Sequence, residues 1–373
     1  MINTLLSTIS YLRSSHHLVL IRHCGSAWQL NFLQRLLDGQ CVVDLSDPAL
    51  REQASWQPGA VAAKVPAGSV LLNLQYAPAV AQHLQGDGYL GVVTQSAVLD
   101  CSAASLLDLP LTDAAKKPFV PGDTQLPSHN NVLDAMVQGG LAAEPFAAAA
   151  DRERFYADYI RELAQRDIMG ITTVSNDVKL YRFLCAVAAG TGRLVNYANL
   201  AKAAGVSSPT AKQWLQFAEG AGLVYLLWPI EHTALHRVAK APKLYFNDTG
   251  LAAHLLRIAG SEDLGQSTFL PGLLENYVVS SIRQSYLSFG IEPQLAYFRD
   301  SNAKEISLLL LRDGVLHPIE IAKDAPTERK LLKKFACLEP VAQAGAVQLG
   351  KGTLISIGQK PNGWSGEVEY VEV

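Results

Sequence analysis

The sequence predicts an α/β protein of three parts, and three patterns along the chain support this prediction. Short apolar runs alternate with helical or loop segments in the first third, which is typical of a parallel sheet covered by helices. The middle holds two helices separated by a tight turn and followed by two apolar runs, and the last third mixes helices and strands again. A chain of 373 residues is long enough for two or three such domains.

The first part is built on four apolar runs with the length of buried strands. They are residues 18–21, 41–45, 69–74 and 89–94. Leu30, Leu33, Leu36 and Leu37 stand at helical spacing and predict a helix after the first run. Four prolines predict an irregular segment over 109–129. We therefore assign the first domain to residues 1–148.

The middle part predicts a helix-turn-helix followed by a hairpin. Helical patterns cover 151–166, 180–189 and 199–204. A further helix is predicted to start with Ser208 as N-cap and Pro209 at its first position, and apolar runs at 224–229 and 243–246 predict two strands. This order is typical of a winged helix-turn-helix, which we assign to residues 149–258.

The last part, residues 259–373, predicts a second α/β domain. A helix is expected over 273–286, and strands are expected at 305–311, 316–321 and 353–357. The Arg312-Asp313-Gly314 sequence between the first two strands is typical of a hairpin turn.

Composition narrows the class of protein. Hydrophobic residues make up 49% and charged residues 17%, so the chain has ample material for packed cores. Its net charge of −3 excludes a globally basic nucleic-acid-binding protein but leaves room for a local basic patch. We see neither a signal peptide nor an apolar stretch long enough for a membrane span, so we expect a cytoplasmic protein without a membrane partner. The five cysteines form no C-x-x-C pair and are expected to fill small core positions.

Four stretches together resemble a large family of prokaryotic AAA-type ATPases. The most specific is AKAPKLYFNDTGL at 239–251, and the others are 188–196, 273–278 and 317–321. Members of that family carry a P-loop ATPase domain, a winged helix and a C-terminal domain of unknown function with a restriction-nuclease-like core. The resemblance therefore implies a P-loop NTPase-like parallel-sheet domain, a winged helix-turn-helix and a nuclease-like α/β domain.

The nucleotide site that the resemblance implies lacks its key residues. A P-loop needs glycines that let backbone N–H groups surround phosphates, a lysine for the β- and γ-phosphates, and a hydroxyl for magnesium. By spacing, Trp28 stands at the second glycine, Gln29 at the lysine and Leu30 at the hydroxyl. The remaining positions of this vestigial loop are Arg22, His23 and Gly25.

The acidic motif on the third strand is also lost, because Leu72 and Asn73 stand where the family has Asp-Glu. No carboxylate is then left there to hold magnesium or to orient the attacking water. We expect no ATP hydrolysis and no cofactor. The alternative is an active protein that binds ATP and magnesium through an atypical loop.

The nuclease-like site is partly degraded. In the family, an E-x-D pair and an E-x-K pair lie on neighbouring strands, where alternate residues share a face and can surround a metal. Here the pairs read Glu305-x-Ser307 and Glu320-x-Ala322, while Glu275 is kept on the preceding helix. Lys323 is expected on the opposite face from Glu320. For Glu305 and Glu320 we favour a solvated or salt-bridged strand face over a metal-dependent nuclease.

The helix-turn-helix offers candidate DNA contacts. Basic and polar side chains near the start of a recognition helix reach bases and phosphates. The candidates on the second helix and the wing are Thr210, Lys212, Gln213, Arg237, Lys240 and Lys243. DNA contact and a structural role for this module both remain open.

Together these observations predict a pseudoenzyme: a degenerate AAA-type ATPase-like protein that acts by binding DNA, another protein or a second copy of itself. The alternatives are an active ATPase with an atypical P-loop, a plain DNA-binding regulator, and a metal-dependent nuclease.

Overall fold

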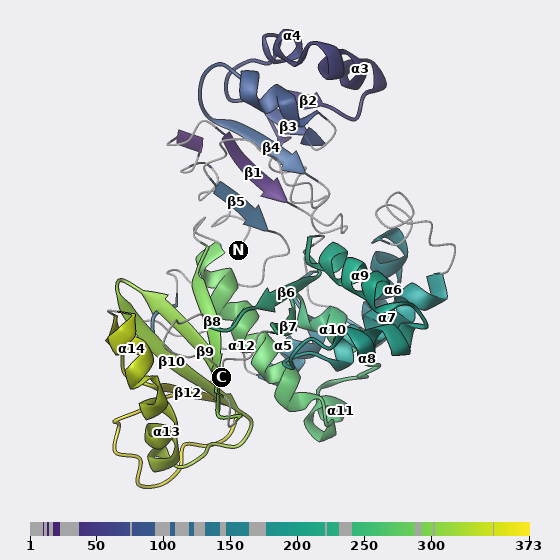
Figure 1. Cartoon of the computed structure of the whole chain (residues 1–373). Helices are drawn as coiled ribbons and strands as arrows, with labels where there is room; N and C mark the ends of the chain where they lie inside the picture. The colour runs from purple at the N-terminus through teal and green to yellow at the C-terminus, as the bar shows by residue number, and fades with distance from the viewer. Residues whose placement is uncertain are drawn as a thin grey trace.

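A computed structural model provides the fold of the chain. It describes residues 10, 13–14, 18–22, 37–74, 77–93, 105–108, 119–122, 131–141, 147–163, 177–220, 222–230, 241–287, 292–300, 303–345 and 347–373. Figure 1 shows a parallel sheet in the N-terminal part, a helical middle part with a hairpin, and a mixed sheet near the C-terminus. The chain is therefore a mixed α/β protein, as its sequence predicts.

The N-terminal sheet is parallel throughout. Its strands lie in the order β2 (Val42–Asp44), β3 (Val70–Leu72), β4 (Tyr89–Val93), β1 (Leu18–Arg22) and β5 (Ser105–Asp108). The four predicted apolar runs each supply one strand. β5 was not predicted, because only two apolar residues stand in it and its pairing with β1 is a long-range contact.

Short helices cover this sheet. They are α3 (Pro48–Trp56), α4 (Pro58–Ala62) and the 3₁₀ helix η2 (Pro78–His83). Buried side chains from these helices pack with Leu18, Leu71 and Leu74 in one core. The helix predicted over residues 30–37 lies almost wholly outside the described residues.

The middle part has the predicted order of helices and hairpin. Its elements are α5 (Val132–Gln138), α6 (Ala149–Leu163), α7 (Asp177–Ala189), α8 (Tyr197–Ala204), α9 (Ser208–Gly220), β6 (Val224–Leu227), β7 (Lys243–Phe246), α10 (Thr249–Leu255) and α11 (Ser261–Gln266). The predicted cap of α9 is wrong by one residue, because Ser207 rather than Ser208 accepts a bond from the Thr210 N–H, at 3.2 Å.

The C-terminal part packs a long helix on a mixed sheet. α12 (Leu270–Leu287) precedes β8 (Gln294–Arg299), β9 (Glu305–Arg312) and β10 (Val315–Ala322). The rest comprises α13 (Glu328–Phe335), η4 (Ala336–Leu338), α14 (Glu339–Ala344), β11 (Gln348–Leu349), β12 (Thr353–Ser356) and β13 (Glu369–Glu372). The sheet order is β13-β12-β10-β9-β8, with β11 also paired to β10.

The predicted hairpin turn between β9 and β10 is confirmed. Asp313 and Gly314 have φ angles of 50° and 76°, which suits the right-handed twist of the flanking antiparallel strands. This turn fixes the register that places Ile319 opposite Leu308.

One hydrophobic core joins the middle and C-terminal parts. It includes Phe183 on α7, Phe246 on β7, Val278 on α12 and Ile355 on β12, all fully buried. The hairpin also extends to the mixed sheet, since the backbone of Tyr297 on β8 bonds to Trp228 and Ile230 just after β6. Figure 1 shows α12 beside this hairpin.

Glu328 anchors the C-terminal segment to α13. Its carboxylate accepts bonds from the backbone N–H groups of Ser365, Gly366 and Val368 and from the Ser365 hydroxyl. Burial alone would raise the pKa of Glu328, but these hydrogen bonds lower it to about 2.

We therefore expect Glu328 to make the free energy of unfolding depend on pH in the acidic range. Because its pKa is lower in the folded chain than in the unfolded chain, its contribution is complete above the unfolded value and falls as the pH drops toward about 2. Urea unfolding at a series of acidic pH values should show a shallower loss of stability in Glu328→Gln than in the unmodified protein. Glu367→Gln, an exposed neighbour, is the control, and equal slopes for Glu328→Gln and the unmodified protein would contradict the assignment.

The cysteine prediction holds only in part. Cys185 and Cys337 are half-buried and free, whereas Cys41 is exposed because it precedes β2 at the edge of the N-terminal sheet. Cys24 and Cys101 lie outside the described residues. Among the helices that the structure describes, none combines the length and the apolar character needed to cross a membrane.

Candidate functional site

Four charged side chains meet where the hairpin contacts the C-terminal part. The Lys243 ammonium on β7 lies 2.6 Å from Glu275 Oε1 on α12 and 2.5 Å from Glu305 Oε1 at the start of β9. The other Glu305 oxygen is 2.9 Å from Arg299 on β8. Two carboxylates thus face two cations, and the network has no net charge.

The Lys243 side chain is almost completely buried, at 2% exposure. Burial by itself would lower the pKa of Lys243, but the carboxylates of Glu275 and Glu305 raise it above its ordinary value. The ammonium is therefore charged at neutral pH. The prediction that Lys243 contacts DNA is wrong, because its side chain is buried and paired with two carboxylates.

Tyr245 completes the network from the same strand. Residues two apart on a strand share a face, so Lys243 and Tyr245 both reach Glu275. The Tyr245 hydroxyl donates to Glu275 Oε1 at 2.7 Å. Burial first, and then the Glu275 charge, raise the pKa of Tyr245 far above its usual value, which keeps the proton on this hydroxyl.

The second predicted pair lies beside this network on β10. Glu320 Oε1 is 2.6 Å from the Lys334 ammonium on α13, and Glu320 Oε2 is buried with no hydrogen-bond partner among the residues that the structure describes. Burial raises the pKa of Glu320, Lys334 opposes this shift, and the nearby Glu275 charge adds to it. Ala322 stands where the family has the lysine of its E-x-K pair. Lys334 from α13 instead places an ammonium beside Glu320.

Ser307 stands at the position of the missing Asp on β9. Its hydroxyl accepts the backbone N–H of Ile321 at 3.4 Å, so it takes part in the contact between β9 and β10. Sequence reasoning identified Glu275, Glu305, Ser307 and Glu320 but missed Arg299, Tyr245 and Lys334. No local sequence pattern indicates that these three residues contact the glutamates, because Arg299 comes from β8, Tyr245 from the hairpin strand β7 and Lys334 from α13.

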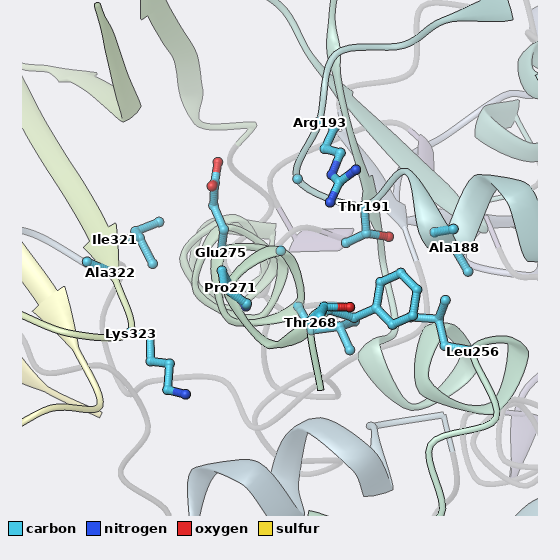
Figure 2. A pocket seen from close by; sticks show the side chains of 15 residues that line it. Ala188, Thr191, Arg193, Leu256, Thr268, Pro271, Glu275, Ile321, Ala322 and Lys323 are labelled. Atoms are coloured by element: carbon cyan, nitrogen blue, oxygen red, sulfur yellow. The ribbon is translucent and has the colours of Figure 1, made fainter. Parts of the chain in front are cut away.

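A cavity of about 270 Å³ opens next to Glu275. Its walls are the end of α7 with the following turn, the first turns of α12, and the end of β10. Figure 2 shows Ala322 and Lys323 on one side of α12 and Thr191 and Arg193 on the other. The Glu275 carboxylate and the Lys323 ammonium point in opposite directions in this view.

The divalent metal that the sequence resemblance implies does not fit these residues. The Lys243 ammonium already lies within hydrogen-bond distance of both Glu275 and Glu305, where a metal would need their oxygens. Glu320 is bound to Lys334, and Ala322 adds only a methyl group. Within the ranges that the structure describes, no three His, Cys, Asp or Glu side chains form a metal-binding group.

The N-terminal sheet places Asn73 next to a carboxylate. Asn73 follows β3 with a φ of 56°, and its amide donates to Asp44 Oδ1 at the end of β2, at 2.8 Å. Burial tends to raise the pKa of Asp44, but bonds from Asn73 and Ser46 lower it on balance. Asp44 was not among the predicted site residues. Its position at the end of an apolar run, where the strand β2 ends, is the signal that could have identified it. Leu72, the other predicted position, is the last residue of β3.

The predicted nucleotide loop is described only at its start. Arg22 is the last residue of β1, and His23, Gly25, Trp28, Gln29 and Leu30 lie outside the described residues. Arg237 and Lys240 of the predicted wing also lie outside them.

The helix α9 has one buried face and one exposed polar face. Ala211, Trp214, Leu215 and Ala218 are buried, and the Trp214 ring packs edge-on against Phe183 of α7, at 5.4 Å between centroids. Lys212, Gln213 and Gln216 are exposed on the opposite face. Thr210 is half-buried, with its hydroxyl 2.7 Å from that of Ser207, so it belongs to the cap of the helix.

Comparison with family models gives two matches. Residues 130–262 match a domain of unknown function named DUF8612, and residues 272–372 match a domain of unknown function named DUF4143. DUF4143 is found in proteins associated with AAA ATPases, which agrees loosely with the resemblance seen in the sequence. No curated protein matches the chain.

Proposed function

We propose that this protein is a catalytically silent relative of AAA-type ATPases that acts by binding double-stranded DNA. The observation that carries this proposal is the exposed polar face of α9, which presents Lys212, Gln213 and Gln216 to solvent. The buried stripe on the other side of α9 holds the helix firmly against α7 and α8. A helix mounted in this way is suited to enter a major groove.

Charge supports the choice of DNA. Lys212 on α9 and Lys202 on α8 are both exposed, and phosphate contacts from such lysines give most of the affinity of a DNA-binding module. The amides of Gln213 and Gln216 are the donors and acceptors that can read base edges. The helix-turn-helix with its hairpin also supports a winged-helix architecture for this part.

The charge network supports binding over catalysis. A nuclease of the implied type needs free carboxylates around a metal, whereas Glu275 and Glu305 share the Lys243 ammonium. We accordingly expect no cleavage of plasmid DNA with Mg²⁺ or Mn²⁺. Cleavage that disappears in Glu320→Ala would instead establish the nuclease alternative.

The DNA prediction is tested by mobility shift on a duplex of arbitrary sequence. Lys212→Glu should weaken binding about tenfold and lower the slope of log affinity against log salt by about one, because one phosphate contact is lost. Lys351→Glu is the matched control, since it reverses an exposed lysine far along the chain and should leave binding unchanged.

Other outcomes would change the assignment. No shift at low salt would exclude DNA binding, and an equal loss in both variants would show that the α9 face is not the contact surface. Self-association that Lys212→Glu abolishes would indicate a second copy as the partner. A rise in melting temperature with ATP and Mg²⁺ would support the ATP-binding alternative, because selective binding to the native state must stabilise it.

A further inference from the structure

The cavity beside Glu275 has an unbalanced positive charge. Of its charged lining residues, Glu275 belongs to the neutral network with Lys243, Glu305 and Arg299. The other two are Arg193 and Lys323, which are both exposed and have no ion-pair partner among the described residues. The cavity is thus electrostatically suited to an anion, although the resemblance implies a metal nearby.

The start of α12 adds to this field. α12 is an 18-residue helix, and Pro271, Gly272 and Leu273 of its first turn line the cavity. The N-terminus of a helix carries a partial positive charge, which favours anions. Here this charge acts mainly at a distance, because Pro271 has no N–H and the N–H groups of Phe269 and Leu270 already bond to Ser267. Gly272 lets the helix come close to the turn after α7, because a Cβ at this position would lie 2.6 Å from the Thr191 carbonyl oxygen.

A buried hydroxyl supplies a second, independent observation. Thr191 lines the cavity at 5% exposure, and its Oγ1 has no hydrogen-bond partner in the part of the chain that the structure describes. A buried polar group without a partner is costly, and native structures rarely keep one without a reason. Figure 2 places Thr191 next to the Arg193 side chain.

We propose that this cavity binds a phosphate group. The Arg193 guanidinium binds phosphate oxygens, and the Thr191 hydroxyl, which is closed to solvent in the free protein, rotates toward the ligand and donates to it. Lys323 attracts the anion from the other side of α12. Arginine suits this task because its planar group donates two parallel bonds to an oxyanion. The site is separate from the α9 face, so it does not rest on the proposed DNA binding.

The test uses inorganic phosphate and pyrophosphate as probes, with sodium chloride matching the ionic strength. We expect the melting temperature to rise by a few degrees at saturating probe, and titration calorimetry to give one site. Arg193→Gln with Lys323→Gln should remove both signals. The control Lys351→Gln, which changes an exposed lysine outside the cavity lining, should keep them.

Thr191→Val separates a ligand-binding role from a structural one. This substitution keeps the shape of the side chain and removes a hydroxyl that has no partner, so the free protein should be at least as stable as before. Phosphate affinity should nevertheless fall about tenfold or more, as expected for one lost hydrogen bond to a charged ligand. A structural role alone would give no change in affinity.

Two sources of phosphate are distinguished by a further comparison. Short single-stranded oligonucleotides with and without a 5′-phosphate are titrated against the full chain. Binding that depends on the 5′-phosphate indicates the end of a nucleic acid as the source, whereas a response to inorganic phosphate or pyrophosphate alone indicates a small molecule. No response to any of these probes, or a response that survives Arg193→Gln with Lys323→Gln, overturns the proposal.

Discussion

Lys243→Met should lower the free energy of unfolding by about 3 kcal/mol. The substitution keeps the length of the side chain but removes the ammonium that lies 2.6 Å from Glu275 and 2.5 Å from Glu305. The two carboxylates would then face each other in a poorly solvated site, and Arg299 would neutralise only one of them. Urea unfolding at about pH 7, followed by circular dichroism, measures the loss.

The same substitution at an exposed position is the control. Lys212→Met on α9 should change stability by no more than about 0.5 kcal/mol, since Lys212 is fully on the surface. The double variant Lys243→Met with Glu275→Gln should recover part of the lost stability, because it removes one of the two repelling carboxylate charges. A stability of Lys243→Met equal to that of the unmodified protein would contradict the assigned network.

Asp248→Ala is the second substitution with a large expected effect, about 4 kcal/mol of lost stability. Asp248 is 2% exposed and caps α10 by accepting the Leu251 N–H at 2.6 Å. It also accepts the Tyr156 hydroxyl and the N–H groups of Gly140 and Leu141, at 2.9, 2.6 and 3.1 Å. Truncation to Ala would leave these four donors, three of them buried and that of Gly140 partly buried, without this acceptor.

Asp47→Ala provides the matched comparison. Asp47 is also an N-cap, but it is exposed and its side chain accepts only the Leu50 N–H, at 2.9 Å. Its loss should cost about 1 kcal/mol, the usual value for a helix cap. Thermal or urea unfolding of both variants measures the difference, and equal losses would show that the bonds to Tyr156 on α6 and to the segment after α5 contribute nothing.

Local sequence patterns correctly predicted those helices, strands and turns whose formation depends mainly on residues close together in the sequence. Apolar runs located β1 to β4, and Asp313-Gly314 located the hairpin between β9 and β10. The helical stripe on α9 also correctly separated buried from exposed side chains. The boundary of α9 shifted by one residue because two adjacent serines compete for the cap.

Long-range packing decided the features that the patterns missed. Lys243 looked like a surface residue because lysine is rarely buried without a partner. All four residues of β7 are in fact buried, since α12 and β9 bring Glu275 and Glu305 onto that strand. The partners stand 32 and 62 positions further along the chain, so no local pattern could link them.

The sequence by itself determined which residue types are available at each position of the degraded motifs, and hence that Ser307 and Ala322 cannot act as a carboxylate and an ammonium. Only the tertiary structure decided how the remaining charges are used. Folding brings the Lys243 ammonium to two carboxylates, whereas Arg193 and Lys323 lie near the start of α12 without an ion-pair partner among the described residues. The physical reason is that charge pairing depends on distances across the folded core, whereas a sequence pattern reports only which face of an element a residue occupies.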